Sequence, residues 1–198
     1  MFCLTTAETG ETRSVGLLPD TDEAGIKKEN DPMKFFTADW HLWHENMLDL
    51  CGRPFNKCNQ MHKKLLYNHN SLVGPKDTLY ILGDVYWKNS PEELERIIRN
   101  YNGRKILILG NHDRLKPFEY VEAGFESVHT SLDIEDFILV HDPCYSIVHP
   151  DRNYLCGHVH DLFVKQKNAL NVGVDVWDFK PISLDVAKGC LRRRKDET

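Results

Sequence analysis

Five short apolar runs recur along the chain, and each ends directly before a polar residue or a glycine that precedes one. The runs are rich in β-branched and aromatic residues, a composition that favours β-strands. They cover residues 35–38, 78–82, 107–109, 137–140 and 154–156 and are followed by Asp39, Gly83-Asp84, Gly110-Asn111, His141 and Gly157-His158. Ligands of α/β sheets bind just beyond the carboxyl ends of the strands. The pattern therefore predicts that these polar residues meet in one cleft.

Helices are predicted between the early strands. Apolar residues in the segment 59–72 recur at helical spacing. A second helix is expected to start with Ser90 as its cap and Pro91 in its first turn, and to run to about Tyr101. A third, short helix is predicted over residues 116–123.

The order of these elements changes along the chain. Strands and helices alternate up to residue 123, which favours parallel strands with right-handed crossovers. Residues 126–171 contain shorter extended runs and no comparable helix. We therefore expect a second, largely antiparallel sheet that packs on the first, with helices outside.

Composition places few restrictions on function. The 198 residues are enough for one domain with a sizeable core, and 41% are hydrophobic. The formal net charge of −5 supplies no overall attraction to nucleic acid or to an anionic membrane. The sequence contains neither a membrane span nor the pattern of a signal peptide. A cytoplasmic location is expected.

The two ends differ in composition from the rest of the chain. Residues 1–32 are rich in acidic residues, glycine and threonine, and we expect a flexible extension there, with a docked regulatory arm as the alternative. The domain is expected to cover residues 33–190, and a basic, polar tail residues 191–198. The six cysteines are scattered without a CxxC pair, which favours reduced thiols.

The polar residues after the strands form a set of possible metal ligands. Asp39 and His41 alternate in an extended segment, so both can face the same cation, and His158 and His160 repeat this spacing. Mixed nitrogen and oxygen ligands suit Mn, Fe, Zn, Ni or Co. Seven ligands are too many for one such ion and indicate two ions that share a carboxylate. The set comprises Asp39, His41, Asp84, Asn111, His141, His158 and His160.

Other residues close to this set are candidates for contact with a substrate. Two ions about 3.5–4 Å apart can activate a bridging water and stabilise in-line displacement at phosphorus. His112 then remains as a proton donor to the leaving oxygen, and Asp113 either orients it or caps the next turn. Arg53 either grips a phosphate or is simply solvated, and His44 either contacts substrate or starts a helix. Trp40 and Trp43 either narrow the pocket or pack beneath it.

The order and spacing of these motifs resemble those of the calcineurin-like metallophosphoesterases. The motifs are Asp39-x-His41, Gly83-Asp84, Gly110-Asn111-His112-Asp113, His141 and Gly157-His158-Val159-His160. Further motifs resemble the small phage and bacterial branch, and these are Arg53-Pro54-Phe55, Leu139-Val140-His141-Asp142-Pro143 and Asn171-Val172-Gly173-Val174-Asp175. The resemblance covers about residues 33–187 and implies an α/β fold. The expected architecture is a four-layer α/β/β/α sandwich of two mixed β-sheets flanked by helices.

The resemblance also implies roles for individual residues. Asp39, His41, Asp84 and His160 would bind one ion, Asp84 would bridge, and Asn111, His141 and His158 would complete the second. His112 would be the acid and would contact the phosphate. We expect two divalent transition-metal ions as cofactors, with Mn²⁺ ahead of Fe, Zn, Ni or Co.

The expected activity is hydrolysis of a phosphate ester by a metal-bridging hydroxide with His112 assisting the leaving group. A small phosphodiester or a nucleotide is favoured as substrate, with Arg53, His44 and Asn111 as its contacts. One alternative is a nuclease, but the sequence shows only scattered basic residues for a nucleic-acid groove. The other alternative is a binding scaffold without catalysis, although such a protein typically loses its acid or its ligands. The oligomeric state stays open.

Overall fold

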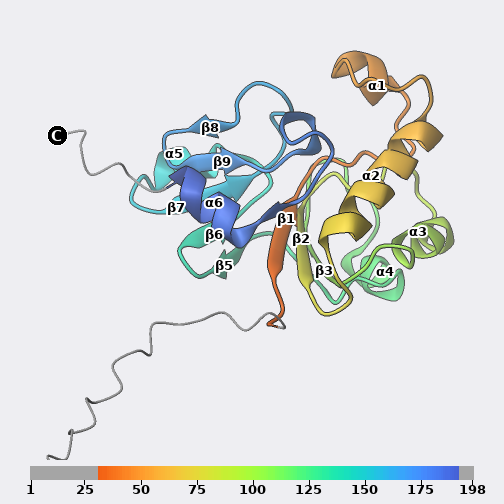
Figure 1. Ribbon diagram of the computed structural model, residues 1–198, viewed down its shortest axis with the longest axis horizontal. Coiled ribbons are helices and arrows are strands. Elements are labelled where there is room, and N and C mark those ends of the chain that lie inside the picture. Colours follow the sequence, from red (N-terminus) through yellow and green to blue (C-terminus); the bar gives the residue numbers. More distant parts are fainter. Residues whose placement is uncertain (1–30, 192–198) are drawn as a thin grey trace, which may run out of the picture. The chain divides into compact units, whose positions relative to one another are not determined.

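The structure is a computed structural model that describes residues 31–191, so most of the expected extension and nearly all of the basic tail lie outside the described residues. Two five-stranded sheets with helices around them make up the fold (Figure 1). All five predicted strands form. In spatial order, the first sheet consists of β10 (Ile182–Ser183), β1 (Lys34–Thr37), β2 (Thr78–Leu82), β3 (Arg104–Ile108) and β4 (Ser127–His129).

The first sheet is parallel from β1 to β4, as the alternation of strands and helices predicted, and only β10 runs antiparallel. Apart from Lys34 and Arg104, the residues of β1, β2 and β3 are buried, which explains why these strands are almost continuously apolar. In β2, Leu79 and Ile81 join the core beneath the helices, whereas Tyr80 and Leu82 face the second sheet.

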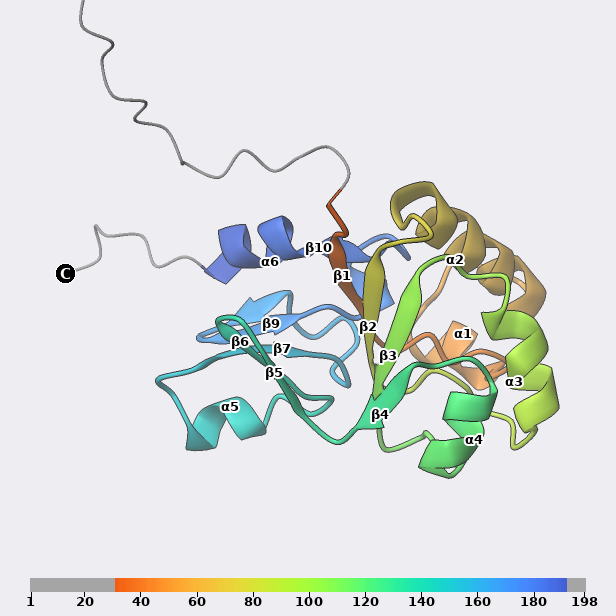
Figure 2. The same ribbon diagram turned by 90° about the horizontal axis from the view of Figure 1, so that it is seen from below.

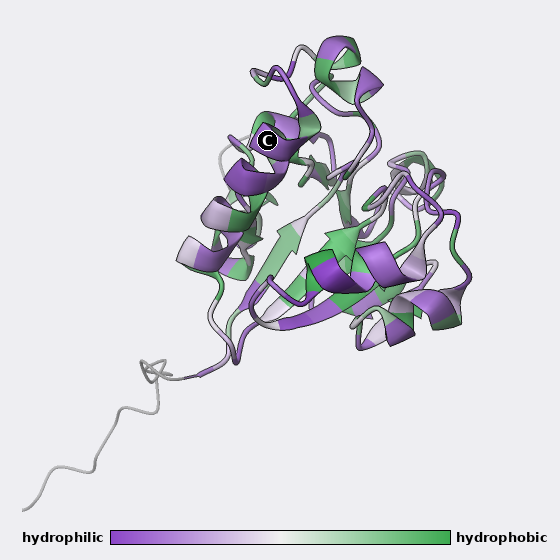
Figure 3. Ribbon diagram, turned by 90° about the vertical axis from the view of Figure 1, so that its right-hand side faces the viewer, coloured by the Kyte–Doolittle hydropathy of each residue, from purple (hydrophilic) through white to green (hydrophobic). Residues whose placement is uncertain are grey.

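Three helices cover the outer face of this sheet (Figure 2), and they are α2 (Cys58–Leu72), α3 (Pro91–Ile98) and α4 (Pro117–Glu122). Figure 3 shows hydrophobic strands behind helices that carry both hydrophobic and hydrophilic residues. The predicted cap of α3 is confirmed, because the Ser90 side chain accepts a hydrogen bond from the backbone N–H of Glu93. The α-helix ends at Ile98, before the predicted Tyr101, because the next turn tightens and Tyr101 N–H bonds to the Ile98 carbonyl.

The second sheet is mixed, as the family resemblance implied, whereas the expectation of a largely antiparallel sheet from the order of the elements was wrong. Its inner pairs β6/β7 and β7/β9 are parallel, and only the outer pairs β5/β6 and β8/β9 are antiparallel. The β6–β7 crossover contains only the four-residue helix α5 (Tyr145–Val148), which is too short to produce a helical period in the sequence. In spatial order, the strands are β5 (Leu132–Ile134), β6 (Phe137–Leu139), β7 (Asn153–Cys156), β9 (Ala169–Asn171) and β8 (Lys165–Gln166).

The two sheets share an apolar core. Phe36 and Ile108 from the first sheet belong to the same cluster as Leu139 and Leu155 from the second. Helix α6 (Leu184–Leu191), which the sequence pattern did not predict, contacts β1, β9 and β10. Its Ala187 and Leu191 join this core. Within residues 31–191, no helix is both long enough and apolar enough to cross a bilayer.

The carboxyl ends of strands from both sheets are joined to one another. Ala38 and Gly173 form a parallel β-bridge, and the N–H of Val174 donates to the Ala38 carbonyl at 3.1 Å. The N–H of Asp39 donates to the carbonyl of Gly83, after β2, at 3.0 Å. The 3₁₀ helix η1 (Val174–Val176) and helix α1 (Asn46–Leu50) lie in the segments that follow β9 and β1. The polar residues after the strands therefore share one edge of the fold.

Candidate metal centre

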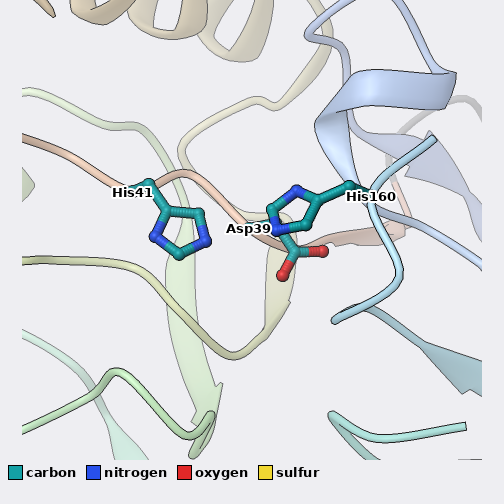
Figure 4. Close-up of side chains that lie close together, drawn as sticks. All are labelled: Asp39, His41 and His160. Atoms are coloured by element: carbon teal, nitrogen blue, oxygen red, sulfur yellow. The ribbon is translucent and has the colours of Figure 1, made fainter. Parts of the chain in front are cut away.

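The loops after β1, β2, β3, β6 and β7 bring all seven predicted ligands into one cluster, with Asp84 between two groups of histidines. The Asp84 Oδ2 atom lies 3.5 Å from His41 Nε2 and 3.5 Å from His141 Nε2. Asp39 forms one ligand group with His41 and His160 (Figure 4) and another with Asp84 and His141, and in each group the ligand atoms lie within 4.8 Å of one another. The convergence that the sequence predicted is thus present in the structure.

A second set of ligand atoms lies on the other side of Asp84. Asn111 Oδ1 is 2.9 Å from His141 Nε2 and 3.0 Å from His158 Nδ1. The other ring nitrogen of His141, Nδ1, lies 2.8 Å from the Leu82 carbonyl and donates to it, so Nε2 is the nitrogen that offers a lone pair once the ring is neutral. Three lone-pair atoms this close together repel one another unless a cation or a proton lies among them. Their arrangement fits a divalent ion.

His41 gives an independent test of this fit. Its Nε2 atom is buried and has no hydrogen-bond partner in the described part of the chain. A buried polar nitrogen without a partner is costly, by about 1–3 kcal/mol. An ion bound by this nitrogen removes that cost, so the residues on this side fit a metal as well.

Backbone strain is concentrated at the same residues. Asp39, His41, Asp84, His158 and His160 all have φ between 48° and 72°, in the left-handed region. Half of the ten non-glycine residues with positive φ in the described range are therefore candidate ligands. Such conformations cost about 1–3 kcal/mol each and are characteristic of functional sites.

Two glycines leave room for the carboxylates. A Cβ atom at Gly110 would lie 2.2 Å from Asp84 Oδ1, and one at Gly157 would lie 2.7 Å from Asp39 Oδ2. Both distances are far inside van der Waals contact. The glycines before Asn111 and His158 are therefore required by the close approach of a ligand from another strand.

Arg53 supports the site from behind instead of gripping a substrate. Its side chain is fully buried, and its Nε and Nη2 atoms donate to Asp175 at 2.8 Å and 2.9 Å. Nη2 also donates to the Asp39 carbonyl at 2.8 Å. Asp175 in turn accepts a hydrogen bond from His160 Nδ1 at 2.8 Å, which leaves Nε2 of that ring free to bind a metal. The expected contact between Arg53 and a substrate phosphate is therefore corrected, because the buried guanidinium already donates its hydrogen bonds to Asp175 and to the Asp39 carbonyl.

Asn171 fixes the loop after β7 that carries His160. Its side-chain amide donates to the carbonyls of His160 and Phe163 at 2.7 Å and 2.9 Å, and its Oδ1 accepts from the N–H of Gly173. This network fixes the backbone at His160. In the sequence, Asn171 and Asp175 stood out only as the two ends of a motif that resembles the family, and nothing there indicated the partnership of Asp175 with Arg53.

His112 and Asp113 follow Asn111 in the loop after β3. The backbone N–H of His112 donates to Asp84 Oδ1 at 2.8 Å, and its half-buried ring lies 5.5 Å from the His41 ring. Asp113 accepts hydrogen bonds from the N–H groups of Asp84, Val85 and Gly110 at 2.8–3.0 Å, with no bond to the His112 ring. Asp113 thus ties the loops after β2 and β3 together, so the expectation that it orients the His112 ring is corrected.

His44 and the tryptophans lie behind or beside the cluster. His44 is buried, with Nδ1 3.3 Å from His41 Nδ1 and its ring stacked on Trp87, so it backs His41 and does not face a substrate. Trp40 is buried and stacks on Tyr101, which places it beneath the site. Trp43 is half-buried and lines a cavity of about 360 Å³ between α2 and α3.

Burial and neighbouring charges change the proton affinity of the ligands. Burial raises the pKa of Asp39 to about 6 and lowers the pKa of His41 to about 2. Burial disfavours the charged form of Asp84, but hydrogen bonding and the charge of His141 prevail and lower its pKa to about 2. Burial also disfavours protonated His160, but the hydrogen bond to Asp175 prevails and raises its pKa to about 10. A proton therefore resides on the metal-free cluster, and an entering cation displaces it.

Comparisons with known proteins agree with this geometry. Residues 35–185 match the calcineurin-like phosphoesterase family. The chain is 30% identical over 172 residues to an uncharacterized protein of Methanocaldococcus jannaschii, an alignment that covers 81% of this chain and 92% of that protein. It is 28% identical over 142 residues to a probable cyclic nucleotide phosphodiesterase of Coxiella burnetii, covering 67% of this chain and 50% of that protein.

A solved structure extends the likeness to the fold. A protein of unknown function from Aquifex aeolicus superposes with a TM-score of 0.64 at 28% identity, and the alignment covers 81% of this chain and all of that one. The family match spans both sheets and every loop that contributes to the ligand cluster. The chain therefore belongs to the calcineurin-like phosphoesterases, metal-dependent enzymes that hydrolyse phosphate esters.

Proposed function

We propose that the protein is a dinuclear metal-dependent phosphodiesterase that acts on a small diester or a nucleotide. Asp39, His41 and His160 hold one ion, Asn111, His141 and His158 hold the other, and Asp84 bridges the two. The position of Asp84 is the main support for this proposal. Its Oδ2 atom is equidistant, at 3.5 Å, from a nitrogen of each histidine group.

The chemistry is divided between the bound ions and the chain. When bound, a pair of divalent ions activates water and neutralises the phosphoryl oxygens during in-line displacement. His112 donates a proton to the leaving oxygen, and its backbone is held beside the centre by the hydrogen bond to Asp84. Asn111, with an exposed side chain next to His112, contacts the phosphoryl group as well as an ion.

The preference for a diester rests on two observations. Asn111 and His158 are exposed, so this side of the centre is open to a substrate with groups on both sides of the phosphorus. One relative is named a probable cyclic nucleotide phosphodiesterase, and cyclic nucleotides are diesters. Both observations favour a diester over a monoester.

The proposal is tested by measuring metal content together with Mn²⁺-stimulated hydrolysis of bis-p-nitrophenyl phosphate and p-nitrophenyl phosphate. We expect about two ions per chain, with faster turnover of the diester. His112→Ala should keep both ions and lose turnover by a factor of about 10²–10⁴ on a substrate with a poor leaving group. His149→Ala is the matched control, because His149 is an exposed histidine outside the ligand cluster.

Each component of the proposal can fail separately. Unchanged turnover of His112→Ala on an alkyl ester would remove the acid role of His112. Two bound ions without turnover on any ester would favour a binding scaffold. A chain that takes up no metal after reconstitution would contradict the dinuclear centre itself.

A further inference from the structure

Arg114 is an exposed cation close to the proposed catalytic histidine. It follows His112 by two positions, and its guanidinium carbon lies 4.3 Å from the centre of the Trp87 ring. Within residues 31–191, no carboxylate pairs with this guanidinium. In contrast, Arg99, Arg104 and Arg152 each form an ion pair with a glutamate or an aspartate.

Trp87 connects Arg114 to the centre. The His44 ring stacks on Trp87 with ring centres 3.6 Å apart and planes only 5° apart, and the His112 ring centre lies 5.2 Å from that of Trp87. One face of an indole cannot hold both an imidazole and a guanidinium at these distances. Arg114 therefore lies on the opposite face, and His44, Trp87 and Arg114 form a three-layer stack beside His112.

The stack positions a cation without neutralising it. The face of a tryptophan attracts a guanidinium through its quadrupole and leaves the N–H donors at the edge of the guanidinium free. Lys88 provides the contrast, because it lies over the Trp43 ring but also pairs with Glu93 at 3.3 Å. Of these two cations that lie over indole rings, Lys88 is paired with a carboxylate in the described part of the chain and Arg114 is not, so Arg114 can pair with an anionic ligand.

We infer that Arg114, held by Trp87, binds a second phosphate of the substrate, one carried by the leaving group. This inference rests on the proposed function, in which His112 protonates the leaving oxygen and so marks the leaving-group side. Free guanidinium donors match two phosphate oxygens in a bidentate arrangement. The substrate class is thus a phosphodiester whose leaving alcohol bears another phosphate, as in a short nucleotide chain.

The test compares dithymidine monophosphate with the same dinucleotide carrying an added 5′-phosphate or 3′-phosphate. The wild type should hydrolyse one of the two phosphorylated forms with a kcat/KM about 10–100-fold higher than that of the parent, since a charge-assisted bidentate contact is among the strong ones. Arg114→Gln should lose most of this ratio, and Arg114→Lys should keep part of it because the charge remains. Arg152→Gln is the control and should keep the ratio, because Arg152 is exposed and directly precedes β7, whereas the ligands follow the other end of that strand.

A binding measurement makes the inference independent of turnover. Thymidine 3′,5′-bisphosphate should change the tryptophan fluorescence of the wild type saturably, thymidine should not, and Arg114→Gln should lose the response.

Hydrolysis of bis-p-nitrophenyl phosphate without any preference among the dinucleotides would overturn this inference and leave the proposed function intact. Absence of all ester hydrolysis would overturn the proposed function, and equal fluorescence responses of wild type and Arg114→Gln would overturn the subsite. Thermal melts of all variants check that each is folded.

Discussion

The two halves of the candidate metal centre are built differently. The inner half, formed by Asp39, His41 and His160, is largely enclosed, with Asp39 and His41 at most 1% exposed. The outer half, formed by Asn111, His141 and His158, contains two exposed residues. Asp84 belongs to both halves. Besides Asp84, each half therefore offers three ligands, but those of the inner half are largely buried and two of those in the outer half are exposed.

The ligands of the inner half are also held by more hydrogen bonds from neighbouring residues than those of the outer half. In the inner half, His160 is held by Asp175 and Arg53, and His41 is backed by His44. In the outer half, His141 is held by the Leu82 carbonyl. Within the described range, the side chains of Asn111 and His158 bond only to each other and to His141. Because support of this kind strengthens metal binding, we expect the inner ion to bind tightly and the outer ion to exchange with solvent.

Asp84→Asn should weaken metal binding in both halves and should have the largest effect of the variants considered. The variant removes the carboxylate that both ions share, so the affinity for both should fall by more than the roughly 10–100-fold expected for a supporting residue. Metal content after gel filtration measures this directly. Asp133→Asn, at an exposed aspartate, is the control. Retention of two ions would show that Asp84 does not bridge.

Gly110→Ala should disturb both halves through the backbone. The new Cβ would lie 2.5 Å from the Asp84 backbone nitrogen, so one of the two loops must move. We expect a loss of about 1–3 kcal/mol in the free energy of unfolding, together with weaker binding of both ions. Gly189→Ala in α6 is the matched control, because its Cβ meets no atom within 4 Å and should increase stability by about 0.5–1 kcal/mol. Equal denaturation midpoints for the two variants would contradict the close packing at Gly110.

Asp175→Asn should separate the halves. It weakens the hydrogen bond that orients His160 but touches no outer ligand. The affinity for the inner ion should fall by about 10–100-fold while that for the outer ion stays within error. Calorimetric titration with Mn²⁺ resolves the two binding events. A parallel loss of both ions would show that the halves do not bind independently.

Ser90→Ala should leave both halves unchanged. It removes the cap of α3, on the outer face of the first sheet, and should cost about 1 kcal/mol of stability. Metal content and turnover of the folded variant should equal those of the wild type. A loss of metal here would mean that ion binding follows overall stability, and the three variants above could not then be interpreted locally.

The sequence predicted the strands that deliver the ligands because each combines a clear apolar run with an abrupt polar end. It failed where the determining contact lies far away in the chain. Nothing near Arg53 indicates that Asp175, 122 positions later, neutralises it in the interior. Nor does the residue pattern around Asp113 reveal three backbone N–H groups converging on its carboxylate. The order of predicted elements missed the parallel pairs of the second sheet for a different reason, since the helix α5 between β6 and β7 has only four residues.

The Arg53–Asp175 ion pair also has a consequence for biosynthesis. Translation proceeds from the amino terminus, and domains form as their segments leave the ribosome. Asp39 and His41 emerge early, whereas the residue that neutralises Arg53 follows it by 122 positions in a chain of 198. Closing so long a loop is a slow, non-local step. A nascent chain therefore cannot assemble a complete inner half until Asp175 has left the ribosome, long after Asp39 and His41 have done so.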